Sequence, residues 1–270
     1  MIEILQFKFF QFAIIGSLLA SIACGIIGTY IVSKRLVFIS GGLTHSSLGG
    51  IGIGLYSGIS PLLCASIFSI LSGFGVEWLT KKKEIREDSA IAVFWTFGMA
   101  VGVIFTFMGS GFTPELSTYL FGNILTISTS DLYFIGILAL SLVLFFGVFM
   151  NPIKIIAFDR EYAKSQKMPV ELFEYILMIF ISLTIVACLH MIGIVLVISL
   201  LTIPQMTANL FTNNFSKIIL LAILIGFIGC LGGLFLSYKL HVPSGASIIF
   251  FSILIYVICK LMSYSRIIKR

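Results

Sequence analysis

The three histidines of this chain, His45, His190 and His241, are its residues best suited to metal chemistry. A neutral imidazole binds zinc and other transition metals through a ring nitrogen. His45 lies ten residues beyond Arg35 in an apolar, glycine-rich segment, a distance of roughly 15 Å along a helix, or about half the hydrocarbon thickness of a bilayer. An ionisable side chain at that depth is costly, and it indicates a pathway or a binding site.

Each histidine also has a simpler interpretation. His45 fits a neutral side chain that hydrogen-bonds to a neighbouring helix. His190 falls between two apolar runs, where capping a helix break is the commoner role. His241 precedes Pro243 in an outward turn, where an interfacial histidine needs no metal. The sequence has no H-E-x-x-H motif and no dense Cys/His cluster, which disfavours an intramembrane zinc protease and a structural zinc site.

The composition indicates that membrane helices carry these residues. The 270 residues are 59% hydrophobic and only 10% charged, with a mean hydropathy of +1.14, whereas soluble domains are about 25% charged. The sequence predicts an all-α polytopic membrane protein with eight or nine transmembrane helices. The segments 173–190 and 191–211 have no clear loop between them, so one of the two is expected to be partial or broken. The expected spans are residues 9–32, 36–57, 61–80, 88–108, 131–151, 173–190, 191–211, 218–238 and 243–262.

Small residues recur at every fourth position around His45: Gly42, Ser46, Gly50 and Gly54. Such a stripe lets membrane helices approach each other closely. In a later apolar run, Pro204 should kink or break its helix because it has no backbone N–H to donate. We therefore expect a tightly packed helix around His45 and an irregular one around Pro204.

Basic residues orient the helices. All Lys and Arg residues except Lys8 and Lys239 fall on one side of the expected spans, and the positive-inside rule makes that side cytoplasmic. The net charge of +6 comes from short loops and the C-terminus, so it gives no reason to expect nucleic-acid binding.

The longest polar stretch is the cytoplasmic segment NPIKIIAFDREYAKSQKMPVELFEY. Asp159 is suited to cap a short helix that runs through Tyr162 to Gln166, and Pro169 ends it. A short helix beneath a membrane domain favours a docking element for a soluble partner, although an ordinary solvated loop fits the same residues.

Four segments, in order along nearly the whole chain, resemble the permease subunits of bacterial ABC importers for zinc, manganese and iron, the ABC-3 family. They are GTYIVSKRLVFISGGLTHSSLGGIGIG from residue 28, REDSAIAVFW from residue 86, LFGNILTISTSDL from residue 120, and the stretch from FDREYAKSQKMP through GIVLVISLLTIPQMTANLF to HVPSGASI. Each segment alone is a weak signal, whereas their ordered combination is specific. The resemblance implies an ABC importer permease fold in one domain, residues 1–270, with a coupling segment at about residues 152–172.

The resemblance also implies partners. Such permeases form a homodimer in the bacterial cytoplasmic (inner) membrane, with cytoplasmic ATPase subunits below and an extracytoplasmic metal-binding protein outside. The chain has no G-x-x-x-x-G-K-[ST] loop, so it is not expected to hydrolyse ATP itself. No permanently bound cofactor is expected, because the metal is cargo. The candidate residues that contact it along its path are His45, His190 and His241. The residues implied in ATPase coupling are Phe158, Asp159, Glu161, Tyr162 and Ala163.

Two departures from the family pattern bear on the cargo. Four residues before the intramembrane histidine, the family commonly has Asp, whereas this chain has Gly41. At the position of His241, the family more often has Asp as well. Imidazole suits zinc, copper, iron and nickel, while carboxylates suit manganese better. The sequence therefore favours zinc, with manganese or iron import by the same machinery as the alternative.

The sequence fits two other kinds of transporter less well. A permease for iron–siderophore complexes or cobalamin is usually longer, with about ten spans. An ion-coupled secondary transporter normally has an inverted repeat and paired intramembrane ionisable residues, and the sequence has no convincing repeat.

Overall fold

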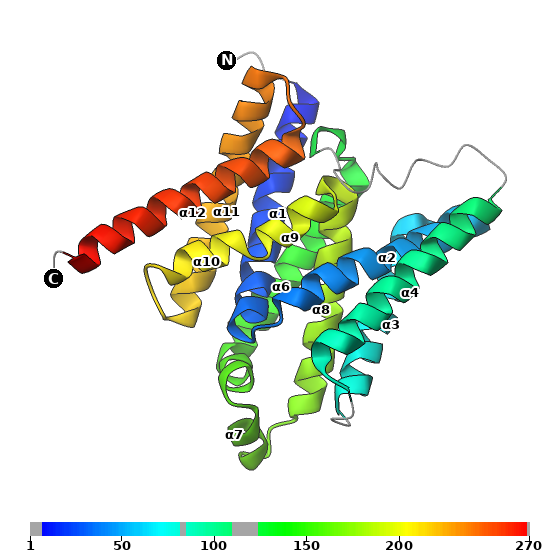
Figure 1. Ribbon diagram of the computed structural model, residues 1–270, viewed down its shortest axis with the longest axis horizontal. Coiled ribbons are helices and arrows are strands. Elements are labelled where there is room, and N and C mark those ends of the chain that lie inside the picture. Colours follow the sequence, from blue (N-terminus) through cyan, green and yellow to red (C-terminus); the bar gives the residue numbers. More distant parts are fainter. Residues whose placement is uncertain (1–6, 82–84, 110–123, 269–270) are drawn as a thin grey trace.

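The protein is all-α (Figure 1), and its computed structural model describes residues 7–81, 85–109 and 124–268. The described part therefore leaves out residues 120–123 of the third family segment. In Figure 1, α2, α3 and α4 run side by side and oblique to the more upright α1 and α8, and α12, on the other side of α1, slants in the same direction as they do. The helices are α1 (Lys8–Ser33), α2 (Val37–Ser57), α3 (Pro61–Lys81), α4 (Glu87–Met108), η2 (Ile124–Thr126), α6 (Thr129–Phe158), α7 (Arg160–Ser165), α8 (Val170–Ile192), α9 (Ile194–Leu200), α10 (Ile203–Asn209), α11 (Phe215–Leu240) and α12 (Ser244–Ile268).

The described residues give seven to nine candidate membrane spans. Seven helices, namely α1, α3, α4, α6, α8, α11 and α12, are long and apolar enough to cross a membrane. The eighth is α2, which has 21 residues but is rich in glycine and serine. The ninth is the broken pair α9 and α10, which together cover residues 194–209. The all-α polytopic architecture that the sequence predicts is confirmed.

The broken span lies where the sequence left two apolar segments without a loop. Gly193 separates α8 from α9 with φ of 83°, a left-handed value that glycine adopts without steric cost. A second break at Thr202 separates α9 from α10 (φ −128°, ψ −53°). Pro204 lies in the first turn of α10, where its missing N–H costs no helical hydrogen bond. The predicted break is therefore confirmed, and it falls two residues before the proline.

A kink in α6 was not predicted from the sequence. Phe149 has non-helical angles (φ −105°, ψ 23°), and Pro152 lies inside the helix three residues later. A proline ring clashes with the carbonyl four residues earlier, which here is that of Val148. The helix continues past this kink to Phe158, seven residues beyond the expected end of its span at residue 151.

The small-residue stripe of α2 lies against two helices. A Cβ atom on Gly42 would clash with Ile91 of α4, and one on Gly50 would clash with the backbone of Cys64 in α3. A Cβ on Gly54 would approach the Cα of Pro61 to 2.7 Å. The backbone of Ser46 leaves no room for a side chain at Gly98 of α4. The stripe thus faces α4 through its first half and α3 through its second.

The α4 side of this contact was missed from the sequence. A Cβ on Gly49 would lie 2.8 Å from the carbonyl oxygen of Gly98, and one on Gly52 would lie 2.5 Å from that of Gly102. Two glycine-lined backbones therefore meet directly, which is the close approach that small residues permit in membranes.

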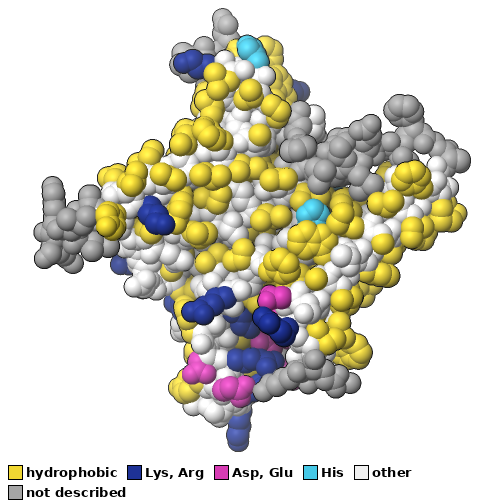
Figure 2. Space-filling view, viewed as in Figure 1, with side chains coloured by type: hydrophobic (Ala, Val, Ile, Leu, Met, Phe, Trp, Pro, Cys, Tyr) yellow, Lys and Arg dark blue, Asp and Glu magenta, His cyan; other side chains and the backbone are white. Residues whose placement is uncertain are grey.

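Charged side chains gather at one end of the molecule, as the lower part of Figure 2 shows. Lys34 at the end of α1 and Arg160 of α7 both contact Glu174 near the start of α8, so these ends lie on the same side. At the other end of α1, Phe10 packs on Phe235 of α11 with ring centroids 6.1 Å apart. This arrangement agrees with the charge-based topology.

Candidate translocation site and coupling region

His45 lies on a face of α2 that is otherwise closed. Every residue of the segment 39–52 is buried except His45, which is half-buried. Its ring stacks on that of Trp95 in α4, with centroids 4.5 Å apart and an angle of 8° between the planes. The Nδ1 atom is buried and has no hydrogen-bond partner among the described residues. The imidazole is therefore held in a fixed plane while one nitrogen remains without a hydrogen bond.

Position 41, one turn before His45, borders the same face. A Cβ atom on Gly41 would lie 3.6 Å from the Trp95 ring and 3.9 Å from Ile198 of α9. These are ordinary van der Waals contacts, unlike those at Gly42 and Gly50. Packing therefore leaves room for a Cβ atom at position 41.

His190 and His241 lie elsewhere. His190, in the last turn of α8, places its Nδ1 3.0 Å from Oδ1 of Asp131 in α6. His241 caps the C-terminus of α11 in the left-handed conformation (φ 55°) and is exposed. Among the described residues, no group of three or more His, Cys, Asp or Glu side chains is placed to hold a metal ion. A complete metal shell would retain its ion, so a transport site is expected to be sparse.

Asp131 also caps its own helix. The Ser128 hydroxyl accepts a hydrogen bond from the Asp131 backbone N–H at 3.2 Å, and Asp131 Oδ2 accepts one from the Ser128 backbone N–H at 3.0 Å. This reciprocal pair is a capping box, which satisfies two donors at the helix start. Asp131 therefore both completes the cap of α6 and pairs with His190.

We expect Asp131→Ala to destabilise the protein more than His190→Ala does. The first change removes both the hydrogen bond that the Ser128 backbone N–H donates to the carboxylate, a loss of about 1 kcal/mol, and the ion pair. The second removes only an ion pair whose histidine is 38% exposed, for which less than about 1 kcal/mol is typical. Thermal unfolding midpoints in detergent test this order, and an equal or larger shift for His190→Ala would contradict it.

The coupling residues predicted from the sequence surround α7. Asp159 caps this helix by accepting a hydrogen bond from the Tyr162 backbone N–H at 2.9 Å, as expected. Phe158, Glu161 and Tyr162 are exposed, whereas Ala163 is fully buried, in a cluster with Ile156 and Val170. Ala163 is therefore placed to anchor α7 on α6 and α8, and the other side chains remain accessible to a partner.

Sequence reasoning missed an ion cluster centred on Glu174 of α8. Arg160 donates to both carboxylate oxygens, from Nε at 2.9 Å and from Nη2 at 2.8 Å, and Lys34 Nζ donates to Oε1 at 3.0 Å. Glu174 is only 6% exposed. Its hydrogen bonds raise the pKa of the Arg160 guanidinium above its usual value. A carboxylate near the start of an apolar helix, after a basic loop, was the available sequence signal.

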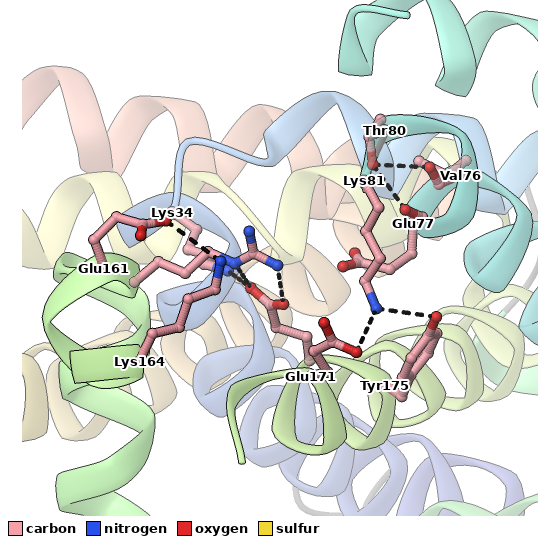
Figure 3. Close-up of polar contacts among 11 residues, drawn as sticks. Lys34, Val76, Glu77, Thr80, Lys81, Glu161, Lys164, Glu171 and Tyr175 are labelled. Carbon is pink, nitrogen blue, oxygen red and sulfur yellow. Dashed lines mark hydrogen bonds and ion pairs between the residues drawn. The ribbon is translucent and has the colours of Figure 1, made fainter. Parts of the chain in front are cut away.

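A second ion pair lies beside this cluster (Figure 3). Lys81 at the end of α3 contacts Oε2 of Glu171 at 3.3 Å and donates to the Tyr175 hydroxyl at 3.1 Å. Glu171 is 68% exposed. Between the two ion pairs lies a polar cavity of about 270 Å³, lined by Lys34, Leu36, Glu77, Thr80, Lys81, Glu87, Arg160 and Glu174.

Comparisons with known proteins agree with this architecture. The ABC 3 transport family matches residues 6–263. An uncharacterised membrane protein of Synechocystis, slr2045, is 36% identical over 258 residues, covering 96% of this chain and 92% of the relative. The manganese transport system membrane protein MntC of Halalkalibacterium halodurans is 31% identical over 247 residues, covering 92% and 85%.

Solved structures share the fold. PsaBC from Streptococcus pneumoniae, in complex with a Fab, superposes with a TM-score of 0.85 at 27% identity, covering 96% of this chain and 93% of that chain. A metal-chelate type ABC transporter in an inward-facing conformation has a TM-score of 0.70 at 18% identity, a likeness of fold alone. This chain therefore belongs to the ABC 3 transport family, as a multi-pass permease subunit of a bacterial ABC transporter that is not itself the ATPase.

Proposed function

We propose that this chain is the permease of an ATP-driven importer of divalent transition-metal ions, with manganese as its favoured cargo. The observation that carries the proposal is His45, the half-buried side chain in an otherwise closed stretch of α2, with a ring nitrogen free of hydrogen bonds among the described residues. Relatives from Halalkalibacterium halodurans and Listeria monocytogenes are named manganese transport proteins, and this supports manganese.

Zinc is the second candidate. The sequence favours zinc because position 41 offers no carboxylate and His45 offers a nitrogen, a donor that suits zinc. The named relatives favour manganese instead, and we give them more weight because path ligands can come from several helices and from a second copy of the chain.

The proposal includes partners and no resident cofactor. The permease works as a homodimer, with cytoplasmic ATPase subunits contacting the exposed side chains around α7 and an extracytoplasmic metal-binding protein delivering the ion. The metal is cargo that binds in passing at His45. His190 and His241 are weaker candidates than His45, and they would belong to the outer part of the path. His190 already pairs with Asp131, and His241 caps α11.

Uptake of radiolabelled manganese and zinc into vesicles that hold the assembled transporter tests this function. We expect manganese uptake to exceed zinc uptake at equal free concentrations. A clear preference for zinc would support the second candidate, and uptake of neither ion would contradict the proposal.

Gly41→Asp should raise the preference for manganese over zinc. A Cβ atom at this position makes only ordinary van der Waals contacts, and the added carboxylate would lie one helical turn from His45. We expect the manganese-to-zinc uptake ratio to rise on the order of tenfold, which corresponds to about 1.4 kcal/mol. Gly41→Asn, which is nearly the same size but uncharged, is the control, and an equal change in that variant would contradict the role of the charge.

A further inference from the structure

The Glu174 carboxylate joins two segments that are distant in the chain. It accepts hydrogen bonds from Arg160, the first residue of α7, and from Lys34, the residue that follows α1. The Arg160 contact is bidentate, a geometry that fixes direction as well as distance. Lys34, at 18% exposed, is also shielded from water.

Each of the two segments leads to a functional part of the protein. Arg160 lies directly beside Asp159, Glu161 and Tyr162 of the coupling region. Lys34 opens the short turn before α2, a turn in which Arg35 has φ of 62°. His45 lies eleven residues after Lys34, on a helix that begins at Val37. An α-helix is stiff along its axis, so displacement of this turn would carry α2 with it.

The cluster should move as a unit. Separating either cation from Glu174 would leave a charge poorly compensated in a buried position, which is strongly unfavourable. When α7 is displaced, moving the turn before α2 along with it therefore costs less free energy than breaking the ion pairs. The Lys81–Glu171 pair contains no residue of α7 or of this turn, and its carboxylate is largely exposed to water.

We propose that Glu174 is a positioning residue that relays movement of α7 to the α1–α2 turn and so to His45. This inference rests on the proposed contact between α7 and the ATPase. It assigns to the Lys34–Glu174–Arg160 cluster the link between ATP hydrolysis outside the membrane and the metal path within it.

Lys34→Gln is the sharpest test, because it removes the link to α2 and leaves the Arg160–Glu174 contact to α7 in place. In vesicles holding the assembled transporter, the number of manganese ions moved per ATP hydrolysed should fall at least about fivefold, the lower end of the usual range for coupling between two sites. Recovery of the ATPase subunits with the permease should not change. Lys34→Arg, which keeps the charge, should retain the ratio.

Glu171→Gln is the matched control, since it removes an ion pair from the same end of α8. An unchanged ratio in assembled Lys34→Gln, or an equal fall in Glu171→Gln, would overturn the relay. Should Lys34→Gln not assemble, Glu174→Asp keeps the charge but shortens the reach, and an unchanged ratio there would overturn it equally. Failure of the wild-type vesicles to take up metal would contradict the proposed function, whereas wild-type uptake with an unchanged Lys34→Gln ratio would contradict only the relay.

Discussion

Gly50→Leu should prevent recovery of folded permease. The first atom of any side chain at this position would overlap the backbone of Cys64 and Ala65 in α3, and a backbone cannot move aside as a flexible side chain can. Overpacking usually costs 1–3 kcal/mol, and we expect about 3 kcal/mol or more here because α2 and α3 would have to separate. Size-exclusion chromatography in detergent and the thermal unfolding midpoint measure the effect.

Gly147→Leu is the matched control. Gly147 lies on an exposed face of α6, and a Cβ atom there would meet no atom within 4 Å. The same Gly→Leu substitution at this position should therefore leave the elution profile and the unfolding midpoint close to those of the wild type. Normal folding of Gly50→Leu, or equal damage in both variants, would show that the contact between α2 and α3 is looser than the structure indicates.

His45→Ala should abolish transport in a protein that still folds. The change removes the imidazole that we place on the metal path, and we expect uptake to fall at least about tenfold, since even the loss of an outer-shell partner costs 10–100-fold at metal sites. Uptake by the wild type should also fall on acidification, because a protonated imidazole has no lone pair to offer a metal. Radiolabelled manganese uptake and the unfolding midpoint are measured together.

Two further variants separate the path from the fold. His45→Phe keeps a flat ring to stack on Trp95 but has no nitrogen, so it should fold and still fail to transport. Ser47→Ala removes a buried hydroxyl whose hydrogen bond goes to the carbonyl of Thr44 in its own helix, and it should transport normally. Normal uptake by His45→Phe would make the histidine structural and would remove it from the path.

The sequence predicted the spans well because each is a continuous apolar run. The expected third span, residues 61–80, matches α3 to within one residue. The α6 boundary was wrong by seven residues because Asn151, Pro152 and Lys154 resemble a loop, although the helix continues through them outside the apolar region. The cap at Asp159 was predictable, since capping depends on residues close in sequence.

The surroundings of the candidate site were not predictable from one sequence. Trp95 is fifty residues from His45, and their stacking depends on how α2 meets α4. Glu174 resembles an ordinary solvated residue at a helix start until the fold brings Lys34 to it from 140 residues away.

The glycine-lined contact of α2 has a consequence for how the chain enters the membrane. With its glycines and serines, α2 is not among the helices apolar enough to be counted as spanning on their own. The helices that cover it, α3 and α4, are made after it on the ribosome. Since an insertion machinery releases segments into lipid according to their hydrophobicity, we expect α2 to be retained there until α3 and α4 emerge, and the three helices to enter the lipid together.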